Sequence, residues 1–162
     1  MQNRSRVILR AVLEGDLPPL PPKTGPADWY TALEDLIDDA PDSVIPPWET
    51  KRIDLMIKDG KIDPDLPIFT MGGSSVHKYA AARNSGGPIY ALKATPKEVP
   101  RIRMPDGREK RVTPRMMARL MSLPDDFNIP EGHALAKTVL GNGIDGNITR
   151  KFIQPMVDRT RR

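Results

Sequence analysis

The sequence predicts an α+β chain: a small β-rich subdomain with short helices, preceded by a strand and followed by a helix that would complete another domain. Short apolar pieces separated by Gly- and Ser-rich turns in residues 66–103 indicate the β-rich part. A run of branched apolar residues near the N-terminus indicates a buried strand. Apolar residues at helical spacing near the C-terminus indicate the final helix.

Composition limits what the chain can do alone. Its 162 residues are 38% hydrophobic, which is low for a self-sufficient core, so we expect a partner to complete the burial. The chain has no cysteine and two histidines, and we therefore expect no metal site. No apolar run is long enough to span a membrane or resembles a secretory segment, so we expect a cytoplasmic protein without a membrane partner.

Charge is distributed unevenly along the chain. Residues 14–65 hold 5 Lys/Arg and 13 Asp/Glu, a balance of −8, whereas residues 66–111 hold 9 Lys/Arg and 3 Asp/Glu, a balance of +6. Because the basic residues alternate with small and turn-forming ones, this basic segment is the candidate for phosphate contacts from loops and short strands. A solvated basic surface explains the charge equally well.

The first predicted element is a strand within residues 1–13. Val7–Leu13 is a nearly continuous apolar run, typical of a strand buried on both faces of a parallel sheet. The chain offers this strand no sheet to join, so we expect it to belong to a sheet of another domain. Its open edges should favour aggregation when the chain is expressed alone.

Residues 14–65 are predicted to be a Pro-rich, acidic and largely irregular connection with one short helix. The helix is predicted over residues 31–37, with Thr31 as a cap and apolar side chains on one face. Trp29 and Trp48 lie on either side of it, and we expect each to be a packing anchor rather than a ring that stacks on a ligand.

Residues 66–130 are predicted to be the β-rich subdomain, with strands at Pro67–Thr70 and Pro88–Leu92. The glycines of Gly72–Ser75 either permit close approach to a ligand or form a plain turn. Arg and Lys of such a basic subdomain can donate hydrogen bonds to guanine in the major groove of DNA. The side chains expected to face DNA are Lys78, Tyr79, Arg83, Asn84 and Lys93.

A helix is predicted to begin at Thr113, the N-cap, with Pro114 at its first position, where the missing N–H is harmless. Met116 stands at the third helical position, where a Glu would complete a capping box. We therefore expect the reciprocal half of that box to be unavailable and the cap to be weaker. The side chains predicted to face the core are Met117, Leu120 and Met121.

Residues 131–162 are predicted to form two helices. The first runs from His133 to Leu140 and is stopped by Gly141–Gly143. The second is amphipathic and is interrupted at Pro155, whose ring removes a backbone hydrogen bond and should bend or end the helix.

Three blocks of this chain resemble conserved motifs of the DNA cytosine-5-methyltransferases, in the family's order. Lys110–Phe127 is similar to the ninth motif, R-x-L-T-P-R-E-x-A-R-L-Q-G-F-P-D-x-F, with Met116 and Ser122 among the residues that replace its usual ones. Gln2–Val7 resembles the eighth motif, Q-x-R-x-R-V, and Leu140–Ile144 resembles the tenth, which contains G-N-[SA]-V. Between its eighth and ninth motifs the family carries its target-recognition domain.

The resemblance implies roles for five residues. Arg6 would reach the carbonyl of the flipped cytosine, Arg4 would lie near the phosphate, and Gln2 would help to place them. Asn142 and Gly143 would line the S-adenosylmethionine pocket. Residues 1–13 and 131–162 would then return to a catalytic α/β domain, and residues 66–130 would form the target-recognition subdomain.

The family's chemistry needs a nucleophilic Cys that lies upstream of the eighth motif, and this chain has no cysteine. We therefore expect the C-terminal subunit or fragment of a restriction–modification methyltransferase, inactive without its N-terminal catalytic half. Its partners would be that half and double-stranded DNA, and S-adenosylmethionine would bind only with that half. Two alternatives stay open: a non-catalytic DNA-binding module or remnant, and an interaction protein that keeps the motifs only for packing.

Overall fold

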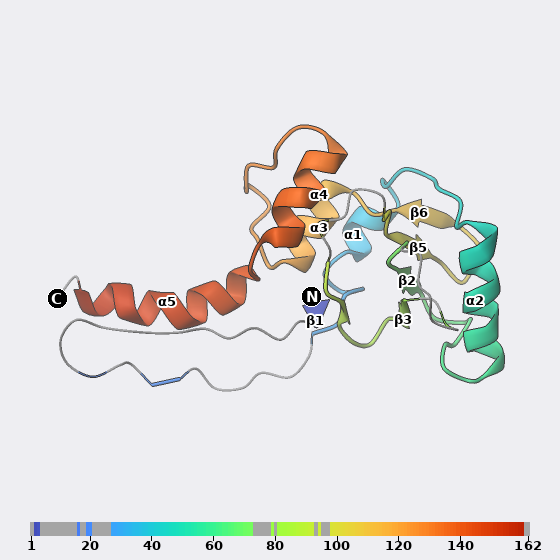
Figure 1. Cartoon of the computed structure of the whole chain (residues 1–162), viewed down its shortest axis with the longest axis horizontal. Coiled ribbons are helices and arrows are strands. Elements are labelled where there is room, and N and C mark those ends of the chain that lie inside the picture. The colour runs from blue at the N-terminus through green and yellow to red at the C-terminus, as the bar shows by residue number, and fades with distance from the viewer. Residues whose placement is uncertain are drawn as a thin grey trace.

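A four-stranded antiparallel sheet organises the computed structural model, in the order β3-β2-β5-β6 (Figure 1). The structure describes residues 2–3, 16, 19–20, 27–72, 79, 81–92, 94 and 98–160. The strands of this sheet are β2 (Ile68–Thr70), β3 (Ala82–Asn84), β5 (Arg101–Arg103) and β6 (Glu109–Arg111).

The predicted strand at 67–70 is confirmed as β2, the buried strand between β3 and β5. The hairpin of β5 and β6 was not predicted, because its strands read Arg-Ile-Arg and Glu-Lys-Arg. A local signal for it exists in Asp106-Gly107, a pair that favours tight turns. Gly107 adopts a φ of +87°, and its N–H donates to the Met104 carbonyl at 3.0 Å.

A second, two-stranded sheet pairs β1 (Gln2–Asn3) in parallel with β4 (Ile89–Tyr90). The prediction of a strand at 88–92 is confirmed by β4. Within the first 13 residues, β4 thus supplies backbone partners for Gln2–Asn3. The predicted strand at 7–13 lies outside the described residues.

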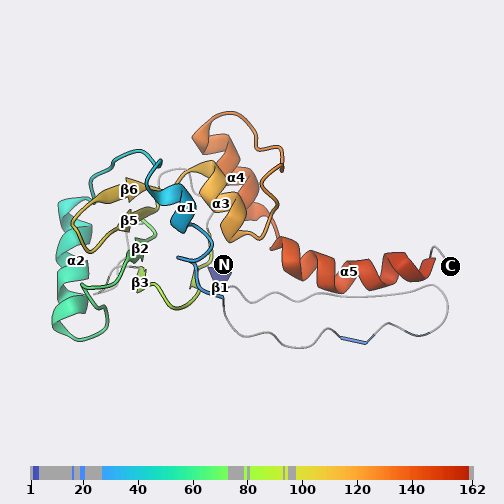
Figure 2. The same cartoon turned by 180° about the vertical axis from the view of Figure 1, so that it is seen from behind.

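Five helices occur in the described part of the chain (Figures 1 and 2). They are α1 (Glu34–Ile37), α2 (Pro47–Lys58), α3 (Pro114–Leu120), α4 (His133–Asn142) and α5 (Gly146–Thr160). None of the helices within these described residues is long and apolar enough to cross a membrane.

Helix α2 corrects the prediction of a largely irregular connection. Pro47 stands at the start of this helix, where its missing N–H leaves no bond unmade, so the adjacent prolines begin a helix instead of preventing one. Ile53 and Met56 of α2 are buried against Ile45 and Ile68 in a small apolar cluster on the sheet. Tertiary burial thus stabilises a helix whose composition is not strongly helix-forming.

The main core joins segments from most of the described chain. Trp29 is fully buried, lies edge-on to Phe69 with ring centroids 5.3 Å apart, and donates its indole N–H to the Asn84 carbonyl at 2.8 Å. The expected role of Trp29 as a packing anchor is therefore confirmed. Trp48 is instead 40% exposed on α2, with the Arg52 guanidinium 5.3 Å from its ring centroid.

The C-terminal helix α5 projects away from the rest of the described structure, at the end remote from α2 (Figures 1 and 2). It is amphipathic, as predicted, but it continues through Pro155 to Thr160. Of the two effects expected of Pro155, to bend or to end the helix, the second is wrong, because the other backbone bonds of the helix remain.

Candidate functional site

The N-terminus of α3, in the ninth-motif block, is capped from both sides. Thr113 Oγ1 accepts from the Met116 N–H at 3.3 Å, and the Thr113 N–H donates to the Met116 Sδ at 3.4 Å. The prediction that the reciprocal half of the capping box is unavailable is therefore wrong. A thioether is a weak acceptor, but here it stands where the carboxylate of a Glu usually does. As predicted, Met117, Leu120 and Met121 are buried in the core.

Two arginines of the same block, Arg115 and Arg119, form hydrogen bonds with residues outside α3. Arg119 donates to both carboxylate oxygens of Asp125 at 2.7 Å and to Asp35 of α1 at 2.5 Å. Hydrogen bonds from Arg119 lower the pKa of Asp35 and of Asp125, and these two carboxylates raise the pKa of Arg119. Arg115 donates to the Phe127 carbonyl at 3.2 Å. These contacts give both arginines a structural role in the ninth-motif block.

Ser122 explains why the ninth motif usually has Gly at this position. Its φ is +56°, in the left-handed region, and it is the only non-glycine with a positive φ among the described residues. Its hydroxyl donates to Asp145 Oδ2 at 2.9 Å. The other oxygen of Asp145 accepts from the N–H groups of Asn147 and Ile148, at 2.9 and 3.2 Å, in the first turn of α5. The ninth-motif block and the start of α5 are therefore held together by one carboxylate.

The tenth-motif residues lie at the end of α4. The helix continues through Gly141 and Asn142, two residues beyond the predicted stop at Leu140. Asn142 is exposed. A Cβ at Gly143 would lie 3.2 Å from the Leu140 carbonyl oxygen and 3.4 Å from Met121 Cε, so the glycine suits the crowding at this position.

An open groove of about 570 Å³ lies beside this junction, between the turn at residues 27–32, the end of α3 and the first turns of α5. Its charged lining residues are Asp28, Arg119 and Arg150. Asn142 and Gly143 are not among its lining residues. The groove is therefore a separate feature from the predicted S-adenosylmethionine contacts.

Two of the predicted DNA-facing residues make contacts within the chain. The Tyr79 hydroxyl donates to Asp59 at 2.6 Å, and the Lys61 ammonium lies 5.0 Å from the Tyr79 ring centroid. The Asn84 amide accepts from the Asp63 N–H and donates to the Asp63 carbonyl, both at 2.8 Å. These bonds give Asn84 a role in closing the turn before β2, which sequence reasoning missed; its contact with DNA stays a prediction.

Arg83 differs from these two residues. Its guanidinium carbon lies 4.3 Å from the centroid of the Tyr90 ring. Its Nε is buried without a hydrogen-bond partner. Arg4, Arg6, Lys78 and Lys93 lie outside the described residues, and only the backbone of Gln2 is described.

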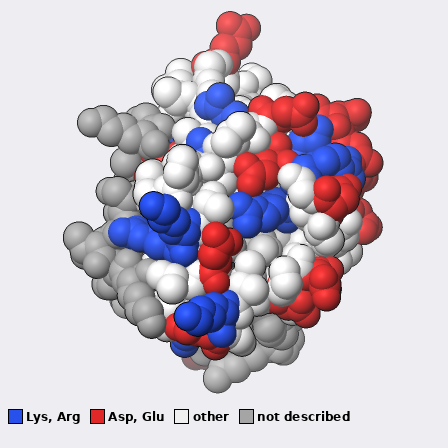
Figure 3. All heavy atoms as spheres, turned by 90° about the vertical axis from the view of Figure 1, so that its right-hand side faces the viewer, with Lys and Arg blue, Asp and Glu red and all other residues white. Residues whose placement is uncertain are grey.

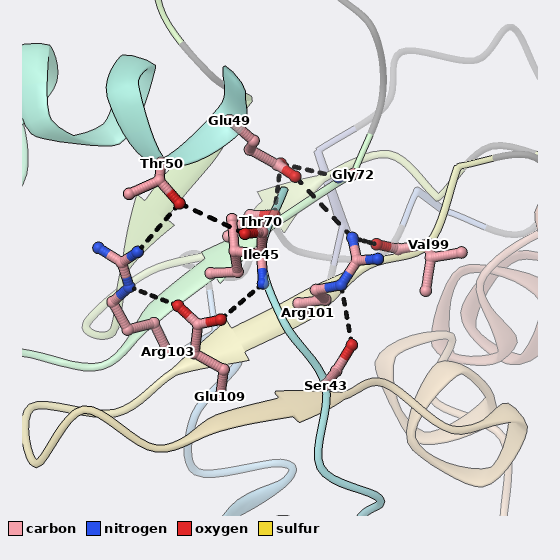
Figure 4. Close-up of polar contacts among 10 residues, drawn as sticks. All are labelled: Ser43, Ile45, Glu49, Thr50, Thr70, Gly72, Val99, Arg101, Arg103 and Glu109. Atoms are coloured by element: carbon pink, nitrogen blue, oxygen red, sulfur yellow. Dashed lines mark hydrogen bonds and ion pairs between the residues drawn. The ribbon is translucent and has the colours of Figure 1, made fainter. Parts of the chain in front are cut away.

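A buried polar network that the sequence analysis missed joins α2 to the sheet (Figure 4). Glu49 is 1% exposed and accepts from the Thr70 hydroxyl at 2.6 Å and from the Gly72 N–H at 3.1 Å. Its other oxygen lies 3.9 Å from Arg101 Nη1, which donates to the Val99 carbonyl at 3.0 Å. The alternation Arg101-Ile102-Arg103 around a buried residue was the available signal for this network.

Gly72 is required by close packing within the chain. Its φ is +66°, and a Cβ on it would lie 2.0 Å from the Val99 carbonyl oxygen. The close approach at Gly72 is thus to another segment of the protein, and the approach to a ligand expected for Gly72–Ser75 stays a prediction. Gly73–Ser75 lie outside the described residues.

Comparison with known proteins agrees with the motif blocks. The family model described as C-5 cytosine-specific DNA methylase matches residues 1–157. The chain belongs to this family. It is also 30% identical over 95 residues to the Type II methyltransferase M.BanI of Aneurinibacillus aneurinilyticus; the match covers 59% of this chain and 17% of the relative. The chain thus spans a small part of that relative's length, and no solved structure matches it.

The Lys and Arg side chains of the basic segment, residues 66–111, differ in whether they already pair with carboxylates of the chain. The structure describes six of the nine Lys/Arg of residues 66–111, and four of these six pair with carboxylates. They are Arg101, Arg103, Arg108 and Lys110. On the face shown in Figure 3, basic and acidic side chains accordingly lie side by side. Arg83 is the described cation of this segment that combines an aromatic contact with a guanidinium nitrogen lacking a partner.

Proposed function

We propose that this chain is the C-terminal subunit or fragment of a DNA (cytosine-5)-methyltransferase of a cytoplasmic restriction–modification system. It would supply DNA target recognition and part of the base and S-adenosylmethionine pockets. The observation that carries the proposal is the family match over residues 1–157 in a chain without any cysteine. Because attack on the cytosine ring requires a thiolate, the nucleophile would come from an N-terminal catalytic half.

The eighth-motif residues would act on the flipped base. A guanidinium at Arg6, close to the base carbonyl, would stabilise negative charge that develops on the ring during thiolate attack. Arg4 would bind the neighbouring phosphate, and Gln2 would orient both arginines. The pairing of Gln2–Asn3 with β4 supports this assignment, because it brings the start of the block beside the β-rich subdomain.

Asn142 and Gly143 would hold S-adenosylmethionine, which supplies the transferable methyl group when bound. An exposed amide at the end of α4 is free of the crowding that surrounds Gly143, and it can donate or accept hydrogen bonds toward a ligand. The rest of the pocket would come from the catalytic half.

Target recognition would rest on residues 66–130. Arg83 would be one of its contacts, since a guanidinium can donate two parallel hydrogen bonds to guanine in the major groove. Lys78 and Lys93 would add phosphate contacts. Tyr79 and Asn84, which also bond within the chain, would present the neighbouring backbone and side chains to DNA.

Co-expression tests this proposal. The chain would be produced with the polypeptide encoded immediately upstream in its source genome, and methyl transfer from labelled S-adenosylmethionine to duplex DNA would be measured. We expect activity from the pair and none from this chain alone. Arg6→Ala in the pair should abolish activity, whereas the matched control Arg108→Ala should not, because Arg108 pairs with Asp38 and Asp106 on the surface.

A different result would select the alternatives. Absence of a Pro-Cys motif in the neighbour, together with salt-sensitive DNA binding by this chain, would favour a non-catalytic DNA-binding module. Methyl transfer by this chain alone would contradict the proposal outright.

A further inference from the structure

Tyr90 and Arg83 form an exposed stacked pair on adjacent parts of the β-rich subdomain. Tyr90 is 37% exposed, and the Arg83 guanidinium carbon lies 4.3 Å from its ring centroid. The preceding residue, Ile89, is 1% exposed and anchors β4 in the core. Since side chains alternate along a strand, Ile89 fixes the backbone while Tyr90 points outward.

The guanidinium in this pair is only partly satisfied. Arg83 Nε is buried without a hydrogen-bond partner, and no carboxylate of the described residues pairs with Arg83. Because this nitrogen is shielded from solvent, a ligand cannot reach it, and the contribution of Arg83 to the pair is to position the tyrosine ring. The planar guanidinium also holds one face of the tyrosine ring, which limits the conformations the ring can adopt.

The position of the pair connects it to the flipped base. In the register of β1 with β4, Tyr90 lies opposite Asn3. Asn3 is followed directly by Arg4, the residue proposed to lie near the phosphate of the target nucleotide. The strand that carries Tyr90 is therefore paired with the strand directly before the residues that would contact the flipped cytosine.

We infer that Tyr90, held by Arg83, is a stacking contact for a nucleobase left without its partner when the target cytosine leaves the duplex. The inference rests on the proposed function and adds a residue to it. Flipping removes stacking and pairing from the neighbouring bases, and an aromatic face restores part of that stacking for any base. Arg83 would keep the ring in place beneath that base.

Binding to a duplex that contains an abasic site tests this inference. Fluorescence anisotropy of the full chain would be measured with two labelled duplexes that differ only in an abasic site opposite one guanine. We expect the abasic duplex to bind more tightly by about fivefold or more, the lower end of a base–aromatic stacking contribution. Tyr90→Ala should remove this preference, and Tyr90→Phe, which keeps the ring, should retain it.

Trp48 offers a matched control. It is also an exposed ring under a guanidinium, but it lies on α2, which flanks the sheet at the end remote from β1 (Figures 1 and 2). Trp48→Ala should leave the preference unchanged. Thermal melting of each variant would verify that the fold is retained, because both rings are partly exposed.

The outcomes separate this inference from the proposed function. Equal binding of the two duplexes by the wild type, or an undiminished preference in Tyr90→Ala, overturns the inference and leaves DNA recognition standing. Loss of the preference in Trp48→Ala also overturns it, since the effect would then not be local to Tyr90. Binding of neither duplex at low salt overturns the inference and DNA recognition together.

Discussion

The acidic segment at residues 14–65 and the basic segment at residues 66–111 have opposite charge balances, −8 and +6. Three ion pairs of the described residues join the two segments. Asp38 pairs with Arg108, Asp42 with Lys110, and Glu49 with Arg101. The basic segment alone therefore overstates the positive charge that DNA would meet. A charge count along a sequence becomes a statement about partners only after internal pairs are removed.

The pairs between the two segments differ in burial and so in importance. Arg108 and Asp38 have side chains that are 48% and 78% exposed, and such surface pairs contribute little to stability. Glu49 and Arg101 have side chains that are 2% and 14% exposed, and Glu49 also bonds Thr70 and Gly72. The buried contact, which joins α2 to the sheet, should therefore contribute more to stability than the surface pairs.

Among the substitutions considered, Glu49→Ala should lower the stability of the fold most. It leaves the Thr70 hydroxyl and the Gly72 N–H without an acceptor and the Arg101 guanidinium without its buried counter-charge, and we expect the free energy of unfolding to fall by about 3–5 kcal/mol. Urea denaturation would measure the change. Glu49→Gln keeps one carbonyl acceptor and should lose less; an equal loss in both variants would mean that shape, not hydrogen bonding, is what Glu49 provides.

Arg83→Ala should show which cations of the basic segment serve DNA. If Arg83 contacts a base, the binding free energy should weaken by about 1–3 kcal/mol. Arg108→Ala should leave DNA affinity unchanged, because Arg108 is already paired with Asp38 and Asp106. Anisotropy titrations at several salt concentrations would compare the two, and equal losses would show that total charge alone decides binding.

Gly72→Ala should strain the backbone at the residue whose N–H donates to Glu49. The left-handed backbone alone costs an alanine about 1–2 kcal/mol, and its Cβ would also clash with the Val99 carbonyl oxygen. Thermal unfolding would measure the loss. Gly60 provides the control, since its φ is +65° but nothing lies within 4 Å of an added Cβ; a loss in Gly72→Ala no greater than in Gly60→Ala would show that the contact with Val99 is unimportant.

Acid should weaken the surface ion pairs, and we expect this to change stability less than the substitutions above. Hydrogen bonds from Arg119 and Lys110 lower the pKa values of Asp35 and Asp42 below their usual 3.8. The folded state therefore binds fewer protons than the unfolded state, and the stabilisation is complete above pH 3.8 and lost as the pH falls below it. Melting temperatures measured through this range should decline less in Asp42→Asn than in the wild type, and parallel curves would contradict this assignment.

Local signals in the sequence were sufficient for several elements. Thr113 and Pro114 marked the start of α3, and the spacing of Met117, Leu120 and Met121 marked its buried face. Two apolar runs marked β2 and β4. Three motif blocks were also enough for the family, because they are read from neighbouring residues and not from contacts.

Long-range packing decided most of the rest. The prolines at 46 and 47 suggested an extended chain, but burial of Ile53 and Met56 on the sheet makes this segment a helix. β5 and β6 carry charged residues that only become strand-forming once Glu49, Asp42 and Glu109 pair with them. Asp38 and Arg108 are 70 residues apart, and no local pattern joins them. Periodicity and caps depend on neighbours in the chain, whereas charge pairing and buried polar contacts depend on neighbours in space.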